Sequence, residues 1–252
     1  EIKIMHRNEL EVYLNQLLEI PRFCDYCPNG LQVEGKENIQ TVISGVTASL
    51  DLLQAAAAAS ADAIIVHHGY FWRGENQRLV GLKHRRIALL MAREMNLYAY
   101  HLPLDIHADF GNNVQLGQKL GLVETGRFGE QDIAMYGNLT LPMTLRELGA
   151  KISQTLLREP MMVGDSDKLI RRVAWCTGAA QSYFDEAIQL GVDVFITGEI
   201  SEQTVHNARE SGVAFISAGH HATERYGVQA LGEHLAQQFG ITHQFIDIDN
   251  PV

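Results

Sequence analysis

The residues best suited to chemistry in this sequence are the adjacent histidines His67 and His68, which are followed by Gly69. They come directly after the apolar, β-branched run of residues 63–66, a pattern typical of a buried parallel strand. Open α/β sheets build their sites at the carboxyl ends of such strands. Because successive side chains of a strand point to opposite faces, both histidines can serve one site only if the chain turns there or if two metal ions share it. The alternative is a strand that simply ends in solvated polar residues.

Two further clusters each place a carboxylate four residues after a histidine. His101 and Asp105 follow one predicted strand, and His220 and Glu224 follow another in the second half of the sequence. Pro103 disfavours helical geometry in the residue before it, so we expect His101 and Asp105 on a curving loop. The second cluster contains no proline and can begin a helix that presents both of its side chains on one face. The alternative is a set of surface histidines with helix-capping acids.

Together these clusters offer three imidazoles and two carboxylates as metal ligands: His67, His68, Asp105, His220 and Glu224. They are too many for one tetrahedral ion and suit two ions with open coordination positions. Each carboxylate has two oxygens, so Asp105 and Glu224 are the natural bridges between the ions and would act in activating water. No cysteine belongs to the set, which therefore favours Zn, Fe, Mn or Ni. His101, His107 and Glu199 are candidates for orienting the ligands or moving protons.

An internal repeat relates the elements that must position these clusters. Val42 and Asp62 recur as Val173 and Asp193, each 131 positions later, and the span between them reads as strand, helix and strand in both copies. At this offset the two adjacent histidines are replaced by a Gly-Glu pair that ends in Glu199, still polar and still at the end of a strand. The repeat predicts a duplicated βαβ unit with polar residues at equivalent strand ends.

Local signals predict where several helices and strands begin. Asn8 and Thr144 are each followed three residues later by a glutamate, the pattern of a capping box at a helix N-terminus. Ser49 and Ser182, one in each copy of the repeat, are predicted helix caps. Residues 133–141 have the pattern of an exposed strand.

The fold class that follows is α/β, with two similar α/β units that arise from an internal duplication and pack together with the metal site between them. Residues 1–123 form the first half, with the His-His strand and the His-x-x-x-Asp loop. Residues 124–252 form the second half, with the repeat and the His-x-x-x-Glu cluster, and the two halves can be intertwined.

The composition excludes several classes of protein. A net charge of −10 argues against a protein that wraps nucleic acid, because neutralising phosphates needs a basic surface. No apolar run approaches the roughly 20 residues of a membrane helix, and three cysteines favour a reducing compartment over a disulfide framework. We therefore expect a cytoplasmic protein with no membrane partner. Cys24 and Cys27 form an isolated Cys-x-x-Cys that lacks the companion ligands of a zinc ribbon, and we interpret it as incidental.

These motifs, in this order, resemble the signature of the GTP cyclohydrolase I type 2 homolog family, also called the Nif-three-like family, in its short bacterial form. The segments that carry the resemblance are Asp25-Tyr26, Pro28-Asn29-Gly30-Leu31-Gln32-Val33, His67-His68-Gly69, His101-x-x-x-Asp105 and Gly219-His220-x-x-x-Glu224. The resemblance implies a dinuclear metal centre with two divalent ions per chain, held by the five ligands named above. It also implies a homo-oligomer, a hexameric ring or toroid whose sites face its cavity.

Three functions are compatible with these features. The first is a metal-dependent hydrolase acting on a small nucleotide-like or cyclic amide substrate, with a metal-activated water as nucleophile. The family name implies ring-opening hydrolysis of GTP, although the sequence contains no Gly-rich phosphate loop. The second is a protein that handles or inserts metal without turnover. The third is an assembly or interaction module whose metals hold the ring together.

Overall fold

The strands of the computed structural model form two main β-sheets, one in each of two compact units of the chain. The structure describes residues 4–252. Unit 1 comprises residues 4–110 and 227–249, and unit 2 comprises residues 111–226 and 250–252. The predicted boundary between residues 123 and 124 rests on the sequence repeat and stays a prediction. In the part of the chain that the structure describes, no helix combines the length and the apolar character needed to cross a bilayer.

The sheet of unit 1 has the strand order β13-β4-β5-β6-β2. Its strands are β2 (Gly30–Val33), β4 (Thr41–Thr47), β5 (Ala63–His68), β6 (Asn96–Ala99) and β13 (Thr242–Phe245). Strand β2 pairs antiparallel with β6, and the other neighbours in this sheet pair in parallel. A separate antiparallel pair is formed by β1 (Met5–His6) and β3 (Asn38–Ile39). The strand predicted to carry the adjacent histidines is confirmed as β5.

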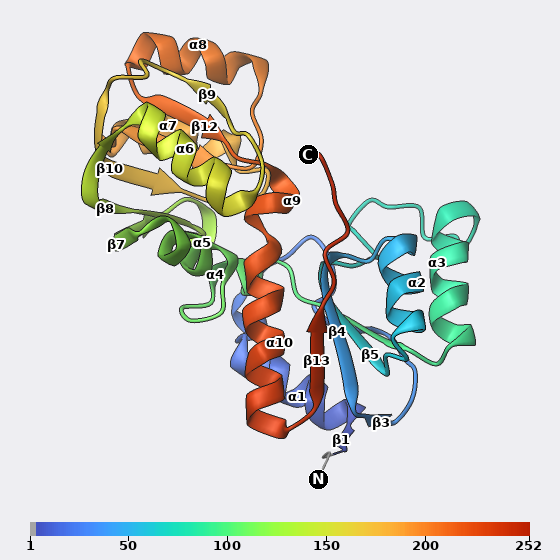
Figure 1. The fold of residues 1–252 in the computed structure, drawn as a ribbon. Helices are drawn as coiled ribbons and strands as arrows, with labels where there is room; N and C mark the ends of the chain where they lie inside the picture. Colours follow the sequence, from blue (N-terminus) through green and yellow to red (C-terminus); the bar gives the residue numbers. More distant parts are fainter. Residues whose placement is uncertain (1–3) are drawn as a thin grey trace. The chain divides into compact units, whose positions relative to one another are not determined.

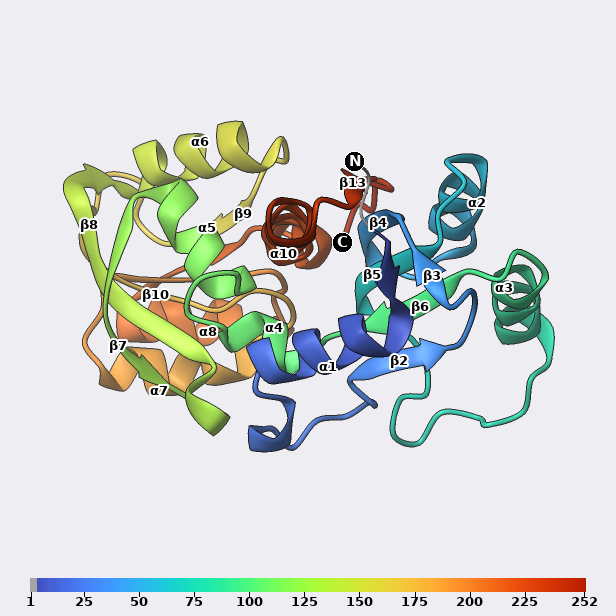
Figure 2. The same ribbon diagram turned by 90° about the horizontal axis from the view of Figure 1, so that it is seen from below.

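Helices cover both faces of the unit 1 sheet (Figure 1). The helical elements are α1 (Arg7–Leu17), η1 (Ile20–Arg22), α2 (Leu50–Ala58), α3 (Gly81–Ala92), α4 (Leu102–Ile106) and α10 (Arg225–Phe239), whose first two residues belong to unit 2. Ile64 of β5 packs with Leu52 of α2 and Leu90 of α3. Its neighbour Ile65 packs on the opposite face with Leu10 of α1. Figure 2 shows α2 and α3 together on one side of β4, β5 and β6. Because both faces are covered, β5 reads as a continuous apolar run.

Unit 2 contains a mixed sheet with the order β7-β8-β10-β11-β12-β9. Its strands are β7 (Leu122–Phe128), β8 (Ala134–Thr144), β9 (Met161–Val163), β10 (Leu169–Trp175), β11 (Val194–Thr197) and β12 (Ala214–Ser217). Strands β10, β11 and β12 are parallel. The helical elements are α5 (Asn112–Leu120), η2 (Glu130–Asp132), α6 (Leu145–Leu156), η3 (Gln181–Tyr183), α7 (Phe184–Gln189), α8 (Glu202–Ser211) and α9 (His220–Thr223). Leu116 of α5 and Leu148 of α6 share one hydrophobic cluster, and Phe184 of α7 and Ala208 of α8 share another.

The sequence repeat is visible in the strand registers of the two units. Val42 of β4 lies opposite Ala63 of β5, and Val173 of β10 lies opposite Val194 of β11. Each residue of the β10–β11 pair thus lies 131 positions after its counterpart in the β4–β5 pair. The α/β architecture predicted from the sequence is confirmed.

In each repeated pair of parallel strands, a half-buried aspartate links the two strands by hydrogen bonds. The Oδ2 atom of Asp62 accepts two successive backbone N–H groups, the second from Thr41, at 3.0 Å each. The Oδ2 atom of Asp193 accepts the equivalent pair, the second from Arg172, at 2.8 Å each. Asp62 and Asp193 are among the residues that revealed the repeat, and their recurrence has a structural reason. Each carboxylate precedes the second strand of its pair and binds the first strand directly before the parallel pairing begins.

Two of the predicted helix starts are confirmed and two are wrong. The Oγ atom of Ser49 accepts the Leu52 N–H at the start of α2, and Thr144 forms a capping box at α6. Asn8 is not a cap, because α1 begins one residue earlier and the ring of His6 accepts the Asn8 N–H. Ser182 is not a cap either, because a 3₁₀ turn leads into α7 without any side-chain hydrogen bond at its N-terminus.

Two further expectations need correction. Asp105 does not lie on a loop, because α4 contains it, whereas His101 does lie in the short connection that precedes this helix. Pro103 occupies the first turn of this helix, where its missing N–H would have no intrahelical partner in any case. The strand predicted at residues 133–141 is confirmed as β8, but it is not exposed along its length, since Met135 is fully buried between β7 and β10.

The hydrogen bonds of Asp62 generate the first testable prediction. Burial raises its pKa, but the hydrogen bonds from Lys36 and from the backbone of Gln40 and Thr41 outweigh this and lower the pKa below the usual 3.8. Asp62→Ala should therefore reduce the free energy of unfolding by about 2 kcal/mol at pH 7. The group has a lowered folded-state pKa, so this difference should be present above about pH 4 and disappear as the pH falls through the folded-state value.

Chemical denaturation at several pH values measures this difference. Asp249→Ala is the matched control, because Asp249 is an exposed carboxylate of the same unit. An equal loss in both variants, or a loss at Asp62 that persists unchanged in acid, would contradict the assignment.

Candidate metal centre

The adjacent histidines at the end of β5 are held by hydrogen bonds to their Nδ1 atoms. His67 is fully buried, and its Nδ1 lies 2.9 Å from the backbone oxygen of Tyr100. A carbonyl oxygen can only accept, so His67 carries a proton on Nδ1, and the neutral form of the ring has its lone pair on Nε2. The Nδ1 of His68 lies 3.0 Å from the hydroxyl of Thr47. The two ring centroids are 4.6 Å apart, so the neighbours lie together despite the strand alternation.

Unit 1 brings a carboxylate and a third imidazole to the same strand ends. Asp105 is buried in α4, and its Oδ1 lies 3.4 Å from the Nε2 of His67. His101, two residues after the end of β6, has its ring centroid 5.1 Å from that of His67 and 5.9 Å from that of His68. One nitrogen of each of these three rings lies within 4.8 Å of the others. Neutral imidazoles and a carboxylate are the donors that borderline divalent metals prefer.

Asp25 is the residue of this cluster whose role the sequence did not reveal. It entered only as part of the family motif, yet its Oδ1 lies 2.7 Å from the Nδ1 of His101. The nearby Cys27 is a different case, because burial, and then the charge of Asp25, raise its pKa to about 12. Without a bound metal ion this thiol is therefore protonated at neutral pH. The interpretation of the Cys-x-x-Cys as incidental stays a prediction.

His107 was a candidate for orienting the ligands, but its hydrogen bonds stabilise a turn instead. Its Nδ1 accepts the backbone N–H groups of Asp109 and Phe110, both at 3.1 Å, and its ring stacks on that of Phe110. Burial lowers the pKa of His107. The imidazole therefore closes the turn after α4.

Unit 2 brings together the second predicted pair and a further acid. The Nε2 of His220 lies 3.2 Å from Glu224 Oε2, and its Nδ1 lies 2.7 Å from Glu199 Oε1. Both ligand candidates are near the carboxyl end of β12, on and just after α9. Burial lowers the pKa of His220, but the hydrogen bonds and charges of Glu224 and Glu199 outweigh it and raise the pKa to about 9. The prediction that Glu199 orients a ligand is consistent with this contact.

Gly178 leaves room for the carboxylate of Glu224. A Cβ at this position would lie 2.2 Å from Glu224 Oε1 and 3.3 Å from His220 Nε2. The backbone is held there by Thr223, whose hydroxyl accepts the Gly178 N–H at 3.0 Å. Gly178 was not singled out from the sequence, although it lies 131 positions after Thr47, which holds His68 in unit 1. The repeat could have identified Gly178, because it places this residue at the strand end equivalent to that of Thr47.

The donor set as a whole fits divalent metal ions. Four imidazoles have an Nδ1 hydrogen bond to a partner within their own unit: His67, His68, His101 and His220. Such outer partners fix the tautomer and the ring orientation of histidines that bind metals through Nε2. Buried carboxylates accompany the imidazoles in both units. These residues would bind a hard or borderline cation, and a thiophilic ion would find no thiolate among them.

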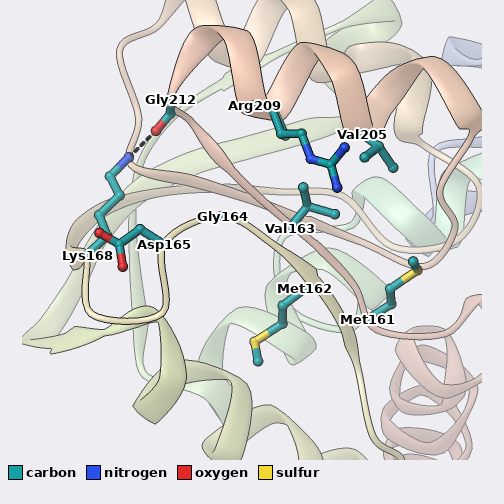
Figure 3. Close-up of a pocket in the computed structure, with 10 residues that line it drawn as sticks. Met161, Met162, Val163, Gly164, Asp165, Lys168, Val205, Arg209 and Gly212 are labelled. Atoms are coloured by element: carbon teal, nitrogen blue, oxygen red, sulfur yellow. Dashed lines mark hydrogen bonds between the residues drawn. The ribbon is translucent and has the colours of Figure 1, made fainter.

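A hollow of about 590 Å³ lies elsewhere in unit 2, beside β9 and α8. Figure 3 shows Met161, Val163 and Val205 along it, with Arg209 extending over it. Lys168 at its rim donates to the backbone oxygen of Gly212 at 2.7 Å. None of the predicted ligands lines this hollow. The candidate metal chemistry therefore belongs to the strand ends and not to this surface.

The fold and these side chains define a class of protein: an α/β protein with histidine and carboxylate clusters, suited to divalent metals, at the carboxyl ends of its strands. The model of the Duf34/NIF3 (NGG1p interacting factor 3) family matches residues 5–251, and the chain belongs to this family. The resemblance predicted from the sequence motifs is confirmed.

Relatives match along nearly the whole chain. The GTP cyclohydrolase 1 type 2 homolog of Pseudomonas aeruginosa is 53% identical over 240 residues, which cover 94% of this chain and 95% of that protein. The homolog of Vibrio cholerae is 52% identical over 252 residues, covering 98% and 100%. The solved structure of protein ybgI, described as of unknown function, is 49% identical with a TM-score of 0.96 and covers 98% of this chain and 100% of its own.

The environment of His220 generates the second prediction. In the metal-free protein, Glu199→Gln should lower the pKa of His220 from about 9 by about one unit or more, because a carboxylate that favours the imidazolium is removed while burial still opposes it. An NMR titration of the imidazole measures this change. Glu202→Gln is the matched control, since Glu202 pairs with the exposed His206 on α8. An unchanged His220 titration in Glu199→Gln would contradict the proposed electrostatics.

Proposed function

We propose that this chain binds two divalent metal ions and uses them to hydrolyse a small nucleotide-like or cyclic amide substrate. The ligands in this proposal are His67, His68, Asp105, His220 and Glu224. The observation that carries it is the hydrogen bonding of the imidazoles: each ligand histidine has its Nδ1 engaged within its own unit. That arrangement directs Nε2 toward a cation.

The number of donors supports joint use of both sets. Unit 1 supplies two imidazoles and one carboxylate, and unit 2 supplies one imidazole and one carboxylate. The five proposed ligands thus divide into three and two, fewer in each unit than the four protein ligands of a closed structural site. In the proposed centre the two sets would act together, and Asp105 and Glu224 would supply the carboxylates that hold the ions. Fe, Zn, Mn and Ni all accept such nitrogen and oxygen donors.

The proposed chemistry divides between the ions and the chain. A pair of divalent ions, when bound, polarises water and orients an electrophile for hydrolytic attack. The carboxylates of Asp105 and Glu224 balance the cationic charge. Glu199 keeps the ring of His220 in place through its Nδ1 hydrogen bond. His101 lies beside the histidine pair and has a ring nitrogen within reach of a proton there.

The substrate class and the assembly come from the resemblance. The curated relatives carry the name GTP cyclohydrolase 1 type 2 homolog, which supports a nucleotide-like substrate for this chain. A homohexameric ring is proposed on the same basis. Metal handling without turnover, and metal-dependent assembly, are the other outcomes that the experiment below distinguishes.

The test is hydrolysis of GTP, other nucleotides and cyclic amides by protein loaded separately with Fe, Zn, Mn or Ni. Loaded protein should release product, metal-free protein should not, and Glu224→Gln should be slower by about 100-fold or more. Bound metal with no turnover across the panel would contradict the hydrolase and favour metal handling. Loss of the oligomer in Glu224→Gln would instead favour metal-dependent assembly.

Two glycine variants sharpen this test. Gly178→Ala should weaken metal binding by about 10-fold or more, because the added Cβ displaces Glu224. Gly212→Ala is the matched control: its φ of +71° nearly equals the +73° of Gly178, but an added Cβ meets nothing within 4 Å. Both variants share the backbone strain, so a loss common to both would contradict the role given to Gly178.

A further inference from the structure

The carboxylate of Asp25 is surrounded by hydrogen-bond donors. Its side chain is only 3% exposed. Oδ1 accepts the Nδ1–H of His101 at 2.7 Å and the backbone N–H of Tyr26 at 2.6 Å. Oδ2 accepts the side-chain amide of Asn29 and the backbone N–H of Leu102, both at 2.9 Å. Each oxygen therefore has two donors, which is an environment built for a carboxylate anion.

The same contacts hold the backbone of His101. Asn29 donates to Asp25 through its side-chain nitrogen and accepts the backbone N–H of His101 through Oδ1 at 2.7 Å. Asp25 in turn accepts the backbone N–H of Leu102. The loop that contains Asp25 and Asn29 thus holds both the ring of His101 and the start of α4 through hydrogen bonds.

The ionisation of Asp25 determines which nitrogen of His101 carries the proton. Burial raises the pKa of Asp25, but the hydrogen bond and charge of His101, with the hydrogen bonds of Asn29 and Tyr26, outweigh it and lower the pKa below 3.8. Asp25 is therefore an anion at neutral pH and can only accept. It follows that Nδ1 of His101 is the donor and that a neutral ring has its lone pair on Nε2.

The surroundings of His101 leave Nε2 available for chemistry. Among residues 4–252, the hydrogen bonds of His101 are made by its backbone and its Nδ1. The ring makes an edge-to-face contact with that of Trp72, with centroids 4.9 Å apart and planes at 90°. It also lies next to the rings of His67 and His68. Since Nδ1 is occupied, Nε2 is the nitrogen that can serve the cluster.

We propose that Asp25 is a positioning residue that fixes His101 as the Nδ1–H tautomer, so that Nε2 can accept a proton beside His67 and His68. The use of this proton acceptor rests on the proposed function. In the hydrolysis, the oxygen of the attacking water bonds to the electrophilic atom of the substrate and one proton of that water passes to Nε2. The bond between the electrophilic atom and the leaving group then breaks, its electron pair stays with the leaving group, and the same proton passes from Nε2 to that group. An anionic partner on Nδ1 stabilises the imidazolium formed in between.

The ¹⁵N chemical shifts of the His101 ring in metal-free wild-type protein, at a pH where the ring is neutral, test the tautomer directly. The proposal predicts a protonated Nδ1 and an unprotonated Nε2. A protonated Nε2 in the wild type would overturn it. This result depends neither on bound metal nor on substrate, so it can fail while the proposed hydrolase stands, or hold if the hydrolase proposal fails.

The variant Asp25→Ala tests the role in turnover. It should populate the Nε2–H tautomer and lower kcat by about 100-fold or more at unchanged metal content. Glu202→Ala, which removes the acidic partner of the exposed His206, should change neither. A shifted tautomer with normal kcat would overturn the proton-accepting role. If Asp25→Ala does not fold, the wild-type shifts still decide the tautomer.

Discussion

The hydrogen bond at Nδ1 is the interaction on which the candidate metal centre depends. His67 donates to a backbone carbonyl, His68 pairs with a threonine hydroxyl, and His101 and His220 each face a carboxylate. These four partners differ in chemistry but have the same consequence, because each fixes one ring nitrogen and directs the other outward. Replacing a partner would leave the histidine in the sequence but not its orientation.

The fold supplies these partners through parallel strands. In unit 1, Thr47 at the end of β4 and Tyr100 after β6 flank β5, so each neighbour of the histidine strand provides a hydrogen-bond partner. In unit 2, Glu199 follows β11 and holds His220 beyond the adjacent β12. The aspartates at the opposite strand ends keep the strands in register. A shift of β5 by one residue would move His67 and His68 to the opposite faces of the sheet.

Local patterns were sufficient to predict part of this arrangement. The apolar run before His67 predicted a strand with polar residues at its carboxyl end, and the recurrence of Asp62 as Asp193 predicted two equivalent α/β units. Helix starts were less predictable, since the ring of His6 competes with Asn8 as the cap and Pro103 is tolerated in the first turn of α4. Of the histidine partners, only Glu199 was named from the sequence, and the others were beyond local reasoning. Asp25 and His101 are 76 residues apart in sequence, and only the folded chain brings them together.

The metal content of the purified protein tests the central claim most directly. It should be measured by elemental analysis beside an Asp105→Ala Glu224→Ala double variant, with the oligomer size of each recorded. The account predicts about two equivalents of divalent metal per chain in the parent and none in a variant that still assembles. A parent that holds no metal, even after reconstitution with Fe, Zn, Mn or Ni, would contradict the account.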